Sequence, residues 1–221
     1  MGAPNDSRRP NRPPLGSRPG RGLIFSAVAL LAAIVGALVA VLVLPGARDR
    51  LLPSLAVQVA AIGGPFRLVD HTGRNVTQAD FRGRFMLLAF GFTNSPDLTP
   101  SQLQLMTAAL NRLGRRGDRV APVFVTLDTE RDGPAELAAW VARFHPRLVG
   151  LGGPTADVAA MAAAWRVPFQ KIPGSAGSGY AIDYPAFIYL MGPDGHYIAH
   201  FGPSIAVADL VLRLERELSG R

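Results

Sequence analysis

The sequence predicts an α/β domain over residues 63–221, preceded by one N-terminal transmembrane helix. Three observations support this prediction. Apolar runs of strand length alternate with helical patterns after residue 62. The 22 residues from Leu23 to Leu44 carry no charge. Finally, 48% of the 221 residues are apolar, which supplies enough material for a sizeable core and excludes a fully disordered chain.

The N-terminal region predicts a tethered protein. Residues 1–22 hold five Arg and one Asp among many Pro and Gly, as in a basic disordered tail. Residues 23–44 would form a helix about 33 Å long, enough to cross a bilayer and too long for the apolar region of a cleaved signal peptide. The positive tail stays inside, so we expect a single-pass inner-membrane protein with its domain in the periplasm. Residues 45–62 are a linker.

Composition also limits the chemistry. The tail carries +4 of the formal net charge of +7, so the high sequence pI of about 10.9 comes mostly from a segment whose charge sets the orientation in the membrane. No nucleic-acid partner is therefore predicted. The chain contains no Cys, which excludes disulfides, thiolate metal sites and thiol redox catalysis. We therefore predict that the protein is not an enzyme.

The first part of the domain predicts a strand followed by a helix. Phe85–Phe90 is a continuous apolar run, typical of a strand buried on both faces. Thr99–Leu113 has a helical pattern. Thr99 is the expected N-cap, Pro100 suits the first helical position, and Gln102 would complete a capping box.

The remaining elements follow the same alternation. They are a buried strand over 120–127, a helix that begins at Asp132, a helix over 158–165, strands over 187–191 and 197–201 joined by a turn, and a last helix capped by Ser204. The Gly- and Ser-rich residues 174–179 predict a mobile loop. A thioredoxin-like sheet with helices on both faces fits this order.

The segment between the first strand and its helix reads FGFTNSPDLTP (residues 90–100). It resembles the metal loop of the Sco/SenC family, F-G-F-T-x-C-P-D-x-C-P. Further motifs agree in order, namely GPFRL at 64–68, DFRG at 80–83, TLDTERD at 126–132 and FHPRL at 144–148. The chain is identified as a divergent member of this family, whose members are thioredoxin-like copper chaperones of cytochrome c oxidase assembly.

The resemblance also implies a changed metal site. The family binds copper through two Cys of this loop and one His before the fourth strand. The matching positions here are Ser95, Thr99 and Tyr184. Cu(I) prefers thiolate, thioether or imidazole, whereas these side chains offer neutral hydroxyls at neutral pH. We therefore predict no metal site of the family type and no cofactor.

Two alternatives stay open. The first is a chaperone for copper or another metal that uses atypical ligands, for which Asp97, Asp128 and His71 are the weak candidates. The second is a small-molecule enzyme with a pocket near Ser95 and Tyr184.

The preferred interpretation is a non-redox binding or assembly module with a degenerate copper site. Its expected partners are the bilayer and either an oxidase subunit or a copper-binding paralogue. By analogy with thioredoxin-like folds, the bond between Tyr184 and Pro185 is predicted to be cis and to face Ser95.

Overall fold

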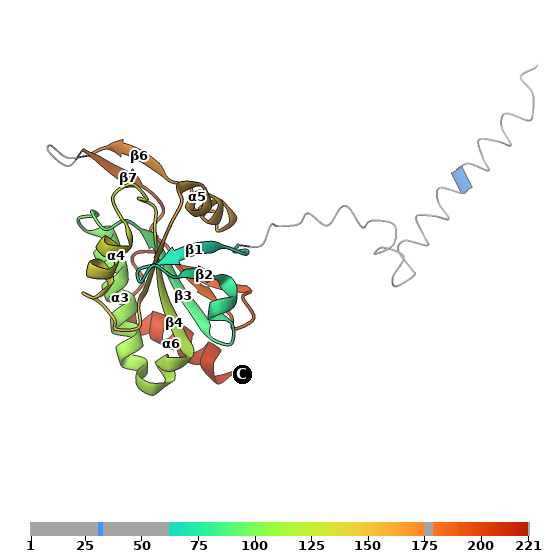
Figure 1. Ribbon diagram of the computed structural model, residues 1–221. Helices are drawn as coiled ribbons and strands as arrows, with labels where there is room; N and C mark the ends of the chain where they lie inside the picture. The colour runs from blue at the N-terminus through green and yellow to red at the C-terminus, as the bar shows by residue number, and fades with distance from the viewer. Residues whose placement is uncertain (1–30, 33–61, 175–178, 221) are drawn as a thin grey trace, which may run out of the picture. The chain divides into compact units, whose positions relative to one another are not determined.

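The computed structural model describes residues 31–32, 62–174 and 179–220 (Figure 1). The chain divides into two compact units, Met1–Val59 and Ala60–Arg221, and every described strand belongs to the second. The predicted tail lies outside the described residues, as do nearly all of the predicted span and linker. Within the described part of the chain, no helix is long and apolar enough to cross a membrane.

A mixed seven-stranded sheet forms the centre of the domain, in the order β2-β1-β5-β4-β3-β8-β9. The inner strands β3, β4 and β5 are parallel, and the outer pairs are antiparallel. The strands are β1 (Arg67–Asp70), β2 (Asn75–Thr77), β3 (Phe85–Gly91), β4 (Val120–Thr126), β5 (Val149–Gly152), β8 (Ile188–Met191) and β9 (Tyr197–Phe201).

Helices cover both faces of this sheet. One face packs against α3 (Leu98–Leu113), α4 (Pro134–Val141) and α6 (Val207–Ser219), and the other against α5 (Thr155–Ala164). Side chains of β3 alternate between the two cores, with Phe85, Leu87 and Ala89 on the first face and Met86, Leu88 and Phe90 on the second. This double burial explains the continuous apolar run in the sequence. Short 3₁₀ turns cover Gln78–Phe81 and Gly114–Arg119.

A second, two-stranded sheet consists of β6 (Gln170–Pro173) and β7 (Tyr180–Asp183), drawn in orange in Figure 1. The sequence did not predict this hairpin, because all four residues of β6 are exposed and show no alternation. Residues 175–178 of the predicted mobile loop between its strands lie outside the described residues. Ile182 of β7 packs into the core cluster that also contains α5.

Three helix starts differ from those predicted at Thr99, Asp132 and Ser204. The observed N-caps are Asp97, Gly133 and Ala206. Thr99 and Asp132 fail as caps because their side chains hydrogen-bond to the loop that follows β3. Gly202–Ile205 instead forms a separate turn ahead of α6, closed by a hydrogen bond from Ile205 N to Gly202 O.

Candidate functional site

The loop between β3 and α3 brings the residues of the predicted metal loop together. β3 ends at Gly91, and a methyl group at that position would lie 2.5 Å from the Thr99 hydroxyl oxygen. Glycine is therefore required for the first turn of α3 to approach the strand this closely. Phe92 N donates a hydrogen bond to Thr99 Oγ1 over 3.2 Å, which fixes the loop to the helix.

The three residues predicted to stand at the ligand positions form a buried cluster. Ser95, Thr99 and Tyr184 are only 6%, 0% and 7% exposed. Thr99 N donates to Ser95 Oγ over 3.3 Å, and Thr99 Oγ1 lies 2.9 Å from the Tyr184 phenol oxygen. These three residues, which lie up to 89 positions apart in the sequence, therefore meet in the folded domain. We refer to Ser95, Thr99 and Tyr184 as the hydroxyl cluster.

Gln102 completes the hydrogen bonding of this cluster. The Tyr184 phenol donates to Gln102 Oε1 over 3.4 Å, and Gln102 Nε2 donates to Phe187 O over 3.3 Å. With the Thr99 hydroxyl donating to Tyr184, one chain of hydrogen bonds runs from Phe92 N to the backbone before β8. Gln102 therefore does not form the predicted capping box.

Burial raises the pKa of Tyr184, and its hydrogen bonds with Thr99 and Ser95 only partly offset that effect. The phenol is therefore neutral at physiological pH. It also packs edge-on against Phe92, with ring centroids 6.2 Å apart. No cis peptide bond occurs among the described residues, so the prediction of a cis bond between Tyr184 and Pro185 is wrong. The common trans isomer already places the phenol against Thr99.

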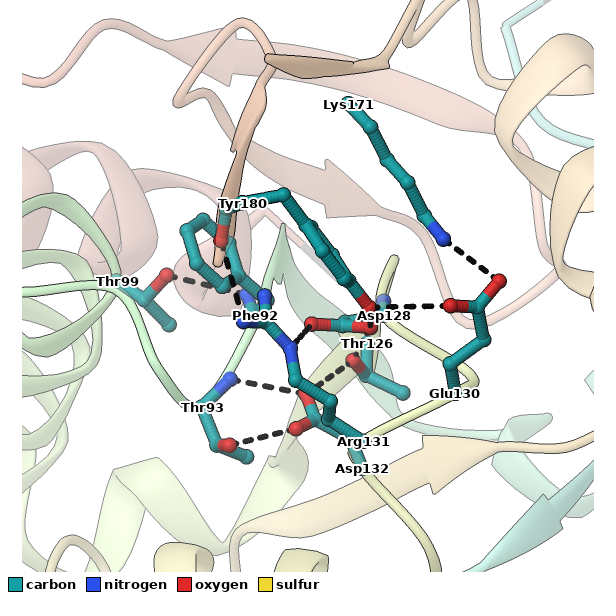
Figure 2. A network of polar contacts seen from close by, with 10 residues as sticks. All are labelled: Phe92, Thr93, Thr99, Thr126, Asp128, Glu130, Arg131, Asp132, Lys171 and Tyr180. Carbon is teal, nitrogen blue, oxygen red and sulfur yellow. Dashed lines mark hydrogen bonds and ion pairs between the residues drawn. The ribbon is translucent and has the colours of Figure 1, made fainter. Parts of the chain in front are cut away.

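Acidic residues after β4 hold the other side of the loop (Figure 2). The buried Asp132 carboxylate accepts hydrogen bonds from Thr93 N at 2.9 Å, Thr93 Oγ1 at 2.6 Å and Thr126 Oγ1 at 2.5 Å. The loop is therefore fixed to the end of β4 by a carboxylate. Asp132 was predicted to begin a helix and not to hold this loop, although its position in the TLDTERD motif was a usable signal.

A second part of the network joins β7 to the segment after β4 (Figure 2). Asp128 forms an ion pair with Arg131 and accepts a hydrogen bond from the Tyr180 phenol over 2.7 Å. The Arg131 guanidinium lies 3.8 Å from the centre of the Tyr180 ring. An outer ion pair between Lys171 and Glu130, 2.6 Å apart, completes the attachment.

The three alternative metal ligands do not meet. His71 lies in the turn after β1, where its Nδ1 accepts a hydrogen bond from Gly150 N. Asp128 is engaged by Arg131 and Tyr180, and Asp97 is exposed at the start of α3. Across residues 62–174 and 179–220, no group of three His, Cys, Asp or Glu side chains is placed to hold a metal ion.

Two clefts flank the hydroxyl cluster. One, of about 460 Å³, opens beside Ser95 and is bordered by Trp140, Arg143 and Tyr180. The other, of about 470 Å³, opens beside Tyr184 and is bordered by Phe169 and Asp183. Among the described residues, the backbone N of Thr99 donates to Ser95 Oγ, and no carboxylate or imidazole that could serve as a general base is hydrogen-bonded to it.

Comparison with known proteins places these features in context. Residues 56–219 match the family model described as SCO1/SenC. The mouse protein named "Protein SCO2 homolog, mitochondrial" is 38% identical over 74% of this chain, and the human "Protein SCO1 homolog, mitochondrial" is 33% identical over 90% of it. The match covers 66% of each of these relatives and 58% of "Protein sco1" from Schizosaccharomyces pombe.

Solved structures agree with the sequence matches. Bradyrhizobium japonicum ScoI with copper bound superposes with a TM-score of 0.66 at 36% identity, over 71% of this chain and 99% of that one. Yeast Sco1 with copper bound gives 0.67 at 32% identity, over 73% and 90%. The domain therefore has the predicted thioredoxin-like fold, with helices on both faces of a mixed sheet.

Proposed function

The chain belongs to the SCO1/SenC family, and from that premise we propose that it is a metal-free, non-redox binding module of respiratory oxidase assembly. The observation that carries the proposal is the hydroxyl cluster. Ser95, Thr99 and Tyr184 occupy the positions that the family's copper ligands are expected to fill, and they bind one another.

The residues present do not fit copper. Their donors are neutral oxygens, and the raised pKa of Tyr184 keeps its phenol protonated. A bound ion would also have to break the hydrogen bond between the buried side chains of Thr99 and Tyr184. A buried polar group that loses its partner costs about 1–3 kcal/mol. The cluster is therefore better suited to holding the loop's shape than to holding an ion.

The absence of Cys removes the other activity of a thioredoxin-like loop, which is exchange with a disulfide. Without metal binding or disulfide exchange, the remaining activity for such a domain is binding to another protein through the surface around this loop. Relatives with the same fold have been solved with copper bound, and the Sco protein BsSco is described as a member of a family of cytochrome c oxidase assembly proteins. We propose that this chain supports the same process by contact and not by delivering the metal.

The proposal includes a location and partners. The basic tail and the uncharged residues 23–44 favour a single-pass inner-membrane protein with its domain in the periplasm. At that surface, the expected partner is an oxidase subunit or a Cys-containing paralogue that carries the copper itself.

Affinity purification of the tagged full chain from cross-linked membranes tests the proposal. The control is the same tail and residues 23–44 fused to an unrelated soluble domain. We expect an oxidase subunit or a copper-binding paralogue to be recovered with the native chain only. Recovery of neither protein, or equal recovery with the control, would count against an assembly role.

A further inference from the structure

The cleft beside Ser95 has features of a binding site, and most of its lining residues lie outside the hydroxyl cluster. It opens where the loop after β3, the end of α4 and β7 meet. Thr93 and Asn94 form one border, Trp140 and Arg143 another, and Tyr180 a third. Its volume of about 460 Å³ falls in the range of about 300–1,000 Å³ typical of ligand sites.

Among the described residues that line this cleft, Arg143 alone is charged. It is exposed, and its guanidinium lies 4.5 Å from the centre of the Trp140 ring. Among the residues that the structure describes, no carboxylate forms an ion pair with it. The stacked guanidinium keeps its hydrogen-bond donors in its own plane, where they can reach a carboxylate.

Three acidic groups near the cleft are already compensated, whereas Asp97, which follows Pro96 of the lining, is exposed and lies outside the lining. Asp132 accepts three hydrogen bonds from Thr93 and Thr126. Asp128 is paired with Arg131, and Glu130 with Lys171. The charge left available at the lining is therefore the positive charge of Arg143, which favours an anionic occupant.

The other borders favour a peptide over a small anion. Tyr and Arg are among the residue types most enriched at the energetic centres of protein interfaces, and the half-buried Tyr180 and the exposed Arg143 supply both here. Trp140 is only 8% exposed and supports the Arg143 guanidinium from below. Pro96 in the lining is exposed, and Leu98, two residues further along the loop, is 49% exposed.

We propose that this cleft binds an extended acidic segment of a partner protein. A Glu or Asp carboxylate of that segment would accept hydrogen bonds from Arg143, and its apolar neighbours would pack against Pro96 and Tyr180. The inference rests on the proposed function, since it names the chemistry of the partner that a binding module would contact.

Calorimetric titration of the full chain in detergent with three synthetic peptides tests this inference. The peptides have equal length and contain Leu and Pro together with Glu, Gln or Lys. We expect the Glu peptide to bind about tenfold more tightly than the Gln peptide, as the loss of a charge-assisted hydrogen bond implies, and the Lys peptide to bind more weakly still. Arg143→Gln should reduce the affinity for the Glu peptide to that for the Gln peptide.

Arg112→Ala is the matched control. Arg112 is an exposed Arg in the last turn of α3, about 18 Å along the helix from Pro100 at the cleft. Its removal should leave the affinity for the Glu peptide within about twofold of the native value. Equal affinities for the Glu and Lys peptides, an unchanged affinity in Arg143→Gln, or no binding of any peptide would overturn the inference.

A copper titration on the same preparation separates this inference from the proposed function. No peptide binding by a chain that retains no copper would reject the acidic-peptide site alone. Tight copper binding would reject the metal-free function, whatever the peptides do.

Discussion

The Thr99 hydroxyl lies 2.9 Å from the Tyr184 phenol, and both groups are buried. Thr99 comes from the first turn of α3 and Tyr184 from the segment after β7, 85 residues later. The contact therefore joins the two segments from which the family's copper ligands are expected to come. The hydrogen bond joins two neutral oxygens, which on the proposed function stand where the family's ligands would hold an ion.

Tyr184→Phe should destabilise the domain by about 1–2 kcal/mol, because it leaves Thr99 and Gln102 without their shared partner. Urea denaturation measures the change. Tyr197→Phe is the matched control, since it also removes one phenol hydroxyl, but from an exposed hydrogen bond with His200. Equal effects of the two substitutions would show that the buried hydroxyl has no special structural role.

Asp132→Asn should cost about 1–3 kcal/mol, because an amide oxygen cannot accept all three of the hydrogen bonds from Thr93 and Thr126. Amide hydrogen exchange should become faster at Thr93. Asp97→Asn makes the same change of charge in the same loop at an exposed N-cap, where Asn serves as well as Asp. If the control lost as much stability, charge alone would explain the result.

Arg131→Leu should loosen the β6–β7 hairpin, because it removes the stack on Tyr180 and the ion pair with the buried Asp128. Breaking a buried pair by removing one partner costs about 3–5 kcal/mol. Lys171→Ala breaks the outer pair with Glu130 and a cation–π contact with Tyr180, both at the surface, and should cost less than about 1 kcal/mol. Hydrogen exchange at the amides of β7 distinguishes the two variants, and similar exchange in both would contradict this assignment.

The buried tyrosines predict a loss of stability in alkali. Burial is the largest cause of the raised pKa of Tyr189, which reaches about 12, and also of the raised pKa of Tyr184. The folded state then holds protons that the unfolded state releases near pH 10, so the stability they contribute is complete below pH 10 and is lost as the pH rises towards 12.

Tyrosinate absorbance and urea denaturation, each measured between pH 8 and 12, check this prediction. Tyr189→Phe should reduce the slope of stability against pH above pH 10. Ionisation of Tyr184 and Tyr189 near pH 10 in a protein that remains folded would contradict it.

The sequence predicted the parts of the fold that repeat a simple pattern. The apolar runs that became β3 and β4 were recognisable because both faces of each strand are buried. β5 was missed because two of its four residues, Gly150 and Gly152, carry no side chain to show a pattern. β6 was missed because it is exposed throughout.

The site was predictable as a set of positions but not as a network. The motif located Ser95, Thr99 and Tyr184, and the structure brings them together. Helix-capping preferences predicted that Thr99 and Asp132 begin helices. In the structure, both side chains instead hydrogen-bond to residues of the loop after β3. Capping preferences depend only on residues near in sequence, so they could not predict the hydrogen bond between Thr99 and Tyr184, which lies 85 residues further along the chain.

Titration of the full chain with Cu(I) against a competing chelator tests the central claim most directly. Ser95→Cys, Thr99→Cys and Tyr184→His combined in one chain provide the positive control, because they return soft ligands to the same three positions. We predict that the native chain retains no copper at micromolar affinity and that the triple variant retains one ion per chain. One tightly bound copper per native chain would contradict the account.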